Sequence, residues 1–366
     1  MAEVSGTHPL YRYFVSTGKE IATLNKSHYV TKPARFEKCP MKQGSQQERT
    51  VKSESEQDVR KSLLFTILFI ASISMIIATT LYNVAIFHWT PEAASQLYQS
   101  LIAHTAEAPM RYRILVPYII QSLGTIIPGN PQDNFLFSYF LYYHVSIAFA
   151  LFSLYGFFRF WYSRRLAFTG ILITAVSLLA AYGDGFFQPW SILEIGLFTV
   201  GLIAIYKDKS ALLAFIILIS SLNRETGIVL CLAYLLAHIS LRRPFLAGKH
   251  IMWGLGYFVI WAVVFIGLRL WLGFVPQLSL AEIIQRNLMP SALVLAGVNL
   301  FLFLGALWIL VYHGYKTSPD FIRNAWRVVP VYLVFFLVFG IWQEIRLLST
   351  LYPILVATIL SQWDTI

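Results

Sequence analysis

The chain has 366 residues, of which 57% are hydrophobic and only 13% are charged. Soluble domains carry roughly 25% charged residues, so this composition excludes an ordinary soluble protein and indicates a polytopic membrane protein. The formal net charge of +10 would suggest nucleic-acid binding in a soluble chain, but here the basic residues cluster in short loops between apolar segments. That distribution is typical of orientation in a membrane. The predicted partner is therefore the lipid bilayer, and no nucleic acid.

The amino-terminal part of the chain differs from the rest. Residues 1–61 are polar and have no long apolar period, so they predict a weakly structured cytoplasmic tail. Residues 62–366 predict a single integral membrane domain. Its first apolar segment, 63–82, is not followed by a cleavage site of small residues and predicts an uncleaved first span. The basic pair Arg60-Lys61 before it favours an amino terminus on the inside.

The segments after the first span predict an all-α, polytopic transmembrane helix bundle. Apolar residues at near-helical spacing over 91–104 predict a helix on the outer membrane surface. The short segment 114–127 predicts a piece that dips into the membrane and returns, or lies along it. The remaining apolar segments bring the total to about ten spans, within a range of roughly nine to eleven. They cover residues 135–158, 166–182, 190–206, 210–222, 226–241, 251–272, 291–313, 328–342 and 346–361.

The basic loops test this topology, because Lys and Arg prefer cytoplasmic loops and each crossing changes sides. These loops are 159–165, 206–209, 242–249 and 316–327. All four face the cytoplasm together only if residues 210–241 cross as a hairpin rather than as one long helix. The sequence therefore predicts this hairpin and places both termini in the cytoplasm.

Three charged clusters interrupt the apolar segments: Gly183-Asp184-Gly185, Asn223-Arg224-Glu225 and Glu344-Ile345-Arg346. Ionisable groups at membrane depth are costly and usually line a polar cavity. A hairpin half of about 13 residues reaches only about 20 Å into a roughly 30 Å hydrocarbon core, so its polar tip must be buried in protein or line a wet cavity. We expect one shared cavity, open to the extracytoplasmic side. The ionised residues directed to that side are Arg111, Arg113, Asp184, Glu194, Arg224, Glu225, Glu344 and Arg346.

Arginine suits such a cavity to phosphate, because its planar guanidinium matches two phosphate oxygens at once. The predicted binding residues for a lipid phosphate or pyrophosphate are Arg111, Arg113, Asn223, Arg224 and Arg346. A carboxylate within apolar walls can act as a general base toward an acceptor hydroxyl. The candidates for this role are Asp184, Glu225 and Glu344.

The layout from residue 63 onward, with a surface helix over 91–104, resembles the GT-C class of integral-membrane glycosyltransferases. The strings Arg111-Tyr112-Arg113-Ile114-Leu115-Val116-Pro117, Asn223-Arg224-Glu225-Thr226 and Glu344-Ile345-Arg346 also resemble those of many bacterial polytopic membrane proteins. The resemblance implies transfer of a sugar from a polyprenyl-phosphate carrier to an extracytoplasmic glycan or lipid of the cell envelope, by an enzyme of the bacterial inner membrane.

Class members commonly carry an acidic residue soon after the first span, as a base or metal ligand. Here the end of that span reads Leu81-Tyr82-Asn83-Val84, and the first acidic residue after it is Glu92. Glu92 and Glu107 are therefore further candidate bases. The histidines have no ligand spacing, so no metal or other cofactor is predicted from the residues.

Each feature also has a structural interpretation. Arg224 with Glu225, and Glu344 with Arg346, are compatible with ion pairs that hold helices together. Arg111 and Arg113 are compatible with headgroup anchors, and Asp184 with an exposed turn. At the level of function, the alternatives to an enzyme are a transporter or flippase for an anionic or lipid-linked solute, and a non-catalytic membrane scaffold.

Overall fold

The computed structural model describes residues 44–88, 90–127, 129–182, 188–238, 248–275, 279–342 and 344–364. Asp184 and its flanking glycines lie outside these residues, as does Gln343. The chain divides into two compact units, Met1–Lys61 and Ser62–Ile366, and each is considered by itself. In the first unit, residues 44–61 belong to a helix, although the sequence predicts weak structure there. The second unit carries everything described below.

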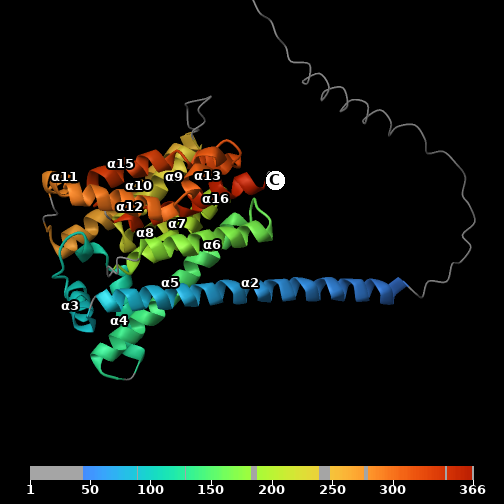
Figure 1. Ribbon diagram of the computed structural model, residues 1–366, viewed down its shortest axis with the longest axis horizontal. Helices are drawn as coiled ribbons and strands as arrows, with labels where there is room; N and C mark the ends of the chain where they lie inside the picture. Colours follow the sequence, from blue (N-terminus) through green and yellow to red (C-terminus); the bar gives the residue numbers. More distant parts are fainter. Residues whose placement is uncertain are drawn as a thin grey trace, which may run out of the picture. The chain divides into compact units, whose positions relative to one another are not determined.

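The described part of the second unit is all-helical, with no strand (Figure 1). The helices are α2 (Gly44–His88), α3 (Pro91–Ile102), η1 (Met110–Tyr112), α4 (Leu115–Ile126), α5 (Pro131–Phe158), α6 (Arg164–Ala181), α7 (Trp190–Tyr206), α8 (Ser210–Asn223), η2 (Glu225–Gly227), α9 (Ile228–His238), α10 (Gly248–Leu272), α11 (Leu280–Asn287), α12 (Pro290–Leu304), α13 (Leu307–Gly314), α14 (Asp320–Ala325), α15 (Val328–Phe339), η3 (Ile345–Leu351) and α16 (Tyr352–Trp363).

Six helical segments within the described residues are long and apolar enough to cross a bilayer, which makes this a multi-pass membrane protein. They are Arg60–Ala85, Asp133–Phe158, Arg164–Ala181, Gly248–Leu272, Asp320–Phe339 and Ile345–Trp363. A seventh is counted if α11 and α12, which meet at a bend of 73°, form one broken span. The predicted total of about ten, which does not count segment 114–127, is thus reached only if this bent pair and the shorter apolar helices α7, α8 and α9 are all counted as spans.

The outer face of α10 shows why these helices require lipid. Leu255, Val259, Val263, Ile266 and Leu270 are all at least half exposed and follow one another at helical spacing. They form a continuous apolar stripe that no other described part of the protein covers. Such a stripe is unfavourable in water and well matched to acyl chains.

Helices α8 and α9 form the predicted hairpin. The backbone leaves the helix at Arg224, which is extended with φ −156° and ψ 154°, and Glu225 then begins the short turn η2. At the other end of the pair, His238 Nε2 lies 3.7 Å from Asp208 Oδ1, so α9 returns to where α8 began. The charged residues Arg224 and Glu225 therefore lie at the hairpin tip.

Three of the basic loops meet at the base of this hairpin. The rings of Trp161 and Phe321 stack at 5.7 Å, and Tyr206 lies against both at 4.9 and 5.1 Å. Arg327 donates a hydrogen bond to the carbonyl of Leu236, near the end of α9, at 3.1 Å. These loops, whose Lys and Arg content predicts that they share one side of the membrane, thus lie at one end of the bundle. The hairpin tip lies at the opposite end.

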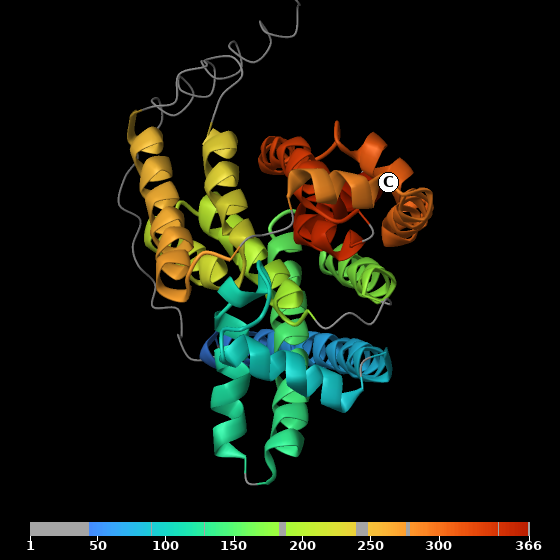
Figure 2. The same cartoon turned by 90° about the vertical axis from the view of Figure 1, so that its left-hand side faces the viewer.

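Helices α3 and α4 precede the hairpin in the chain. α3 starts at a Thr90 cap and buries Ala94, Tyr98 and Leu101, which share one face and pack toward α4 and α5. Figure 2 shows α4 and the first part of α5 running side by side. α4 therefore returns directly into α5, which agrees with a short piece that turns back.

Two features differ from the expected segments. The predicted span 291–313 is broken at Gly305, which has φ +55°, a conformation that favours glycine. A helix that the sequence did not predict, α11, comes before it and is capped by Ser279 and Glu282. Asn287 at its end donates to the Gly340 carbonyl at 2.8 Å and accepts from Trp342 N at 3.0 Å.

Close helix approach holds α13 against α16. Gly314 lies on Thr358, and its carbonyl accepts hydrogen bonds from Ser318 Oγ at 2.8 Å and Ser361 Oγ at 3.0 Å. Inside a bilayer, small residues and interhelical hydrogen bonds of this kind replace the hydrophobic effect as the source of association.

We expect Gly314→Ala to destabilise the protein by about 1–3 kcal/mol, because the added methyl group would overlap the Thr358 backbone. The control is Gly256→Ala, since a methyl group at Gly256 in α10 meets open space. Thermal unfolding in detergent would show a lower melting temperature for Gly314→Ala alone. Equal melting temperatures for the two variants would contradict this account of the α13–α16 contact.

Candidate functional site

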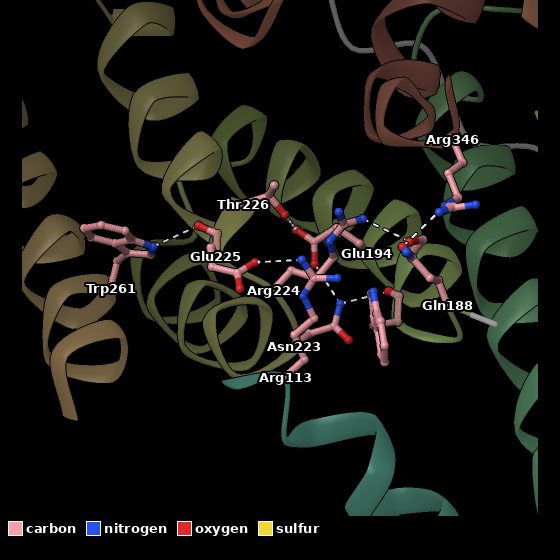
Figure 3. Close-up of polar contacts among 11 residues, drawn as sticks. Arg113, Gln188, Glu194, Asn223, Arg224, Glu225, Thr226, Trp261 and Arg346 are labelled. Carbon is pink, nitrogen blue, oxygen red and sulfur yellow. Dashed lines mark hydrogen bonds and ion pairs between the residues drawn. The ribbon is translucent and has the colours of Figure 1, made fainter. Parts of the chain in front are cut away.

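The candidate site is an ionic cluster at the tip of the α8–α9 hairpin. It joins four places that are distant in sequence: the residues after η1, the start of α7, the hairpin tip and the start of η3. Figure 3 shows side chains from these places converging, with Arg113 and Arg346 entering from different segments of the chain. In the described residues the cluster contains Arg113, Glu194, Asn223, Arg224, Glu225, Glu344 and Arg346.

Glu194 anchors the cluster and is completely buried. Its carboxylate accepts hydrogen bonds from Ser220 Oγ at 2.7 Å and from Asn223 Nδ2 at 2.9 Å. A third bond comes from Thr226 Oγ1 at 3.3 Å. These neutral donors offset the free-energy cost of burying the carboxylate. They also fix the end of α8 against α7.

Asn223, the last residue of α8, also contributes to this contact between α8 and α7. Its amide nitrogen is shared between Glu194 and the carbonyl of Trp190, at 3.0 Å, so the side chain bridges the start of α7 and the end of α8. The following residue, Arg224, donates from Nη1 to Ser191 Oγ at 3.0 Å and is only 3% exposed. The hairpin tip is therefore held by polar contacts to a single turn of α7.

Glu225 forms an ion pair with Arg113, whose Nη2 lies 3.2 Å from Glu225 Oε2. The Arg113 guanidinium also lies 5.1 Å from the centre of the Trp190 ring, a cation–π contact. Trp261 of α10 donates to the backbone carbonyl of Glu225 at 3.0 Å. Arg113 is thus held between a carboxylate and an aromatic face, with α10 supporting the carboxylate's backbone.

Arg346 is completely buried at the far side of the cluster. Its Nη2 lies 3.1 Å from Glu344 Oε2, and its Nε donates to Gln188 Oε1 at 3.3 Å. Glu344 also lies within electrostatic range of Arg113, which links this pair to the Arg113–Glu225 pair. Tyr182 lies near both Arg224 and Arg346. The separate contacts therefore belong to one cluster.

Arg111 does not join this cluster. Its guanidinium donates to the carbonyl of Leu272, at the end of α10, while Tyr112 Oη donates to Gly273 O at 2.9 Å and accepts from Val275 N at 2.9 Å. The last carbonyls of a helix lack partners within it, and these side chains supply them. Arg111 therefore holds α10, whereas the sequence predicts that it binds phosphate with the other arginines.

Several residues that contact the ionic cluster were not predicted from the sequence as site residues. Ser191 lies three residues before Glu194 on the same face of α7, a spacing that would have indicated a polar face. Gln188, Trp190 and Thr226 had no such signal, because their roles depend on tertiary contacts. Arg269 is a further case. It is 9% exposed, stacks on Tyr112 at 4.4 Å and lies within electrostatic range of Glu225.

Some buried polar atoms of the cluster have no hydrogen-bond partner in the described part of the chain. The donors are Nε of Arg113, Nε of Arg224 and Nε1 of Trp190, and the acceptors are Oδ1 of Asn223 and Oε1 of Glu225. Unpaired buried polar atoms are uncommon and call for a bound group or water. Water, or a bound group with both acceptor oxygens and hydroxyl donors, would supply the partners that these atoms lack.

An apolar groove of about 380 Å³ runs beside this cluster. Its lining comes from α4 and the end of α8: Ile114, Leu115, Tyr118, Ile119, Ser122, Leu123, Ile126 and Leu222. Ile114 directly follows Arg113, and Leu222 directly precedes Asn223. Two residues that line the groove are thus sequence neighbours of two residues of the ionic cluster. Among the described residues, no group of three or more His, Cys, Asp or Glu side chains is arranged to hold a metal ion.

Comparison of the chain with protein-family models, with curated proteins and with solved structures finds no match. The interpretation of the cluster thus depends on its geometry.

We expect Arg113→Gln and Glu225→Gln each to destabilise the protein, because each leaves a largely buried charge without its partner. The double variant should lose less free energy of unfolding than the sum of the losses of the two single variants, with a coupling energy of about 1–2 kcal/mol. Unfolding in detergent measures all three.

The exposed pair Arg323 and Asp320 is the matched control, and Arg323→Gln with Asp320→Asn should show no measurable coupling. Additive effects at Arg113 and Glu225 would mean that their contact does not hold the hairpin tip.

Proposed function

We propose that this protein is a membrane glycosyltransferase that moves a sugar from a polyprenyl-phosphate-type carrier to an extracytoplasmic glycan or lipid. The observation that carries the proposal is the set of unpartnered donors and acceptors in the buried cluster. A sugar phosphate offers both complements, because its phosphate oxygens accept hydrogen bonds and its hydroxyls donate them. A simple anion would leave Asn223 Oδ1 and Glu225 Oε1 without donors.

The phosphate would bind to the arginines. Arg224 is held by one neutral hydroxyl, Ser191 Oγ, so its charge is not consumed by a direct ion pair in the described residues. Arg113 contacts the carboxylate of Glu225 and lies within electrostatic range of Arg224. Arg346 contacts the carboxylate of Glu344. Planar guanidinium groups bind phosphate oxygens with fixed geometry, which Lys does not reproduce. Asn223 orients the hairpin tip that carries Arg224.

The apolar groove would hold the isoprenoid chain. It is continuous in sequence with Arg113 at one wall and Asn223 at the other, so a lipid lying in it would present its phosphate to the cluster. Both a tail site and a headgroup site are needed to select a lipid-linked sugar from a soluble one.

For transfer, a carboxylate removes the proton of the acceptor hydroxyl, whose oxygen then attacks the anomeric carbon of the sugar. The bond from that carbon to the phosphate oxygen breaks, and the polyprenyl phosphate leaves with the electron pair, its negative charge stabilised by the arginines. The candidate bases are Glu344 and Glu225, whose side chains are 19% and 25% exposed and hence accessible. Asp184 is the third candidate.

The membrane arrangement that accompanies this proposal is a bacterial inner-membrane protein with both termini in the cytoplasm. The gathering of the basic loops at one end of the bundle supports it, since such loops remain on the cytoplasmic side. The shorter helices α4, α7, α8 and α9 would enter the bilayer together with the six longer ones, and α3 would lie at the outer surface.

The test uses the purified protein in lipid nanodiscs, with a polyprenyl monophosphate as the binding probe and polyprenyl-phosphate sugars, radiolabelled in the sugar, as donors. Arg224→Lys should weaken binding of the monophosphate about tenfold, because it keeps the charge but loses the planar fork. Glu344→Gln should retain or strengthen binding of the monophosphate, because it frees Arg346 from its carboxylate partner, and should slow transfer at least about 100-fold. Arg286→Gln, on the exposed side of α11, is the control and should change neither.

The outcomes separate the classes of function. Transfer to an acceptor supports the enzyme. Movement of the labelled lipid across the bilayer without a new glycosidic bond would instead indicate a flippase. Absence of monophosphate binding by a folded wild-type protein would leave only a scaffold.

A further inference from the structure

A second polar site lies at the other end of the bundle. It is a depression of about 450 Å³ lined by Tyr315, Lys316, Asp320, Arg323, Asn324 and Arg327. These residues connect α13 to α15 through the short helix α14. No residue of the ionic cluster lines it.

The depression lies at a membrane boundary. Asp320 is the first residue of one candidate span, and the last turn of another is joined to the same loop. Two hydrogen bonds join the end of α16 to Thr317 in this loop. Thr317 Oγ1 lies 3.1 Å from Ser361 Oγ, and Gln362 Nε2 donates to Thr317 Oγ1 at 2.7 Å. Two span ends therefore fix the depression at the level where lipid headgroups lie.

The lining is positively charged. It presents three cationic side chains, Lys316, Arg323 and Arg327, against a single carboxylate, Asp320. Arg323 pairs with Asp320, and the Arg327 guanidinium also donates to the Leu236 carbonyl at 3.1 Å. Lys316 is exposed at the rim. The site therefore attracts an anion, and its guanidinium and ammonium groups suit a phosphate diester.

An exposed apolar face leads from the bilayer to this depression. Ile309 and Tyr312 lie on one side of α13, and Tyr315 directly follows the helix; they are 61%, 80% and 44% exposed. Tyr315 belongs to both the face and the lining. A ligand with a phosphate at one end and acyl chains at the other matches this combination, whereas a soluble anion uses only the polar half.

We propose that this depression binds the headgroup of an anionic phospholipid, with the acyl chains along the apolar face formed by Ile309, Tyr312 and Tyr315. The basic residues hold the phosphate at the membrane surface, each contributing about fivefold to the affinity. The site is independent of the proposed sugar transfer.

The experiment compares lipids retained by the detergent-purified full chain in native mass spectrometry after exposure to equal amounts of phosphatidylglycerol and phosphatidylcholine. The wild type should retain phosphatidylglycerol preferentially. Lys316→Gln with Arg323→Gln should reduce this preference by at least about tenfold, because two cations are removed. Asp320→Asn should raise it, since the one competing carboxylate loses its charge. The charge-preserving pair Lys316→Arg with Arg323→Lys should retain it.

Arg165→Gln is the matched control, because Arg165 is an exposed arginine of another basic loop outside the depression. An equal loss of preference in Arg165→Gln and the depression variant would overturn the proposal in favour of general surface attraction. Unchanged preference in the depression variant, or no gain in Asp320→Asn, would also overturn it. Full competition by millimolar inorganic phosphate would identify a soluble anion as the ligand instead. If the Gln variants do not fold, Asp320→Asn and the charge-preserving pair still decide the outcome.

Discussion

The burial of the Glu194 carboxylate is the constraint on which the functional end of this protein depends. A carboxylate without exposed surface must find donors, and Glu194 finds them in Ser220, Asn223 and Thr226. Because Asn223 and Thr226 lie on either side of the hairpin tip, satisfying Glu194 requires the chain to leave the helix between them. The extended Arg224 and the position of Glu225 opposite Arg113 follow from that requirement.

The two ends of the bundle consequently have different electrostatic characters. At the hairpin tip, cations and carboxylates are buried together, and several of their polar atoms lack partners in the described part of the chain. At the hairpin base, the basic groups remain exposed around an open depression. Buried ionic groups require specific geometry and favour a selective ligand, whereas exposed cations interact with an anionic surface of variable composition.

Much of the fold followed from the hydrophobic pattern. The segment 190–206 was predicted with the bounds that α7 has, and the hairpin followed from the placement of basic loops. The pattern failed where local and tertiary effects decide: α11 is short and polar, and Gly305 breaks an apolar run that contains no charge. At the site, composition indicated which segments carry charge. It did not indicate that Arg111 would bind the end of α10 instead of joining the other arginines, because residues two apart on a tight turn can point in different directions.

The link made by Asn287 has a mechanical consequence. Asn287 ends the helix that bends by 73° into α12, and its amide is bonded on both sides to Gly340 and Trp342. Trp342 is two residues from Glu344, so Asn287 joins the bend between α11 and α12 to the segment that carries the partner of Arg346. Hydrophobic helices adjust their tilt to the thickness of the surrounding lipid. A change in the tilt of α12 would therefore act on the segment that carries Glu344.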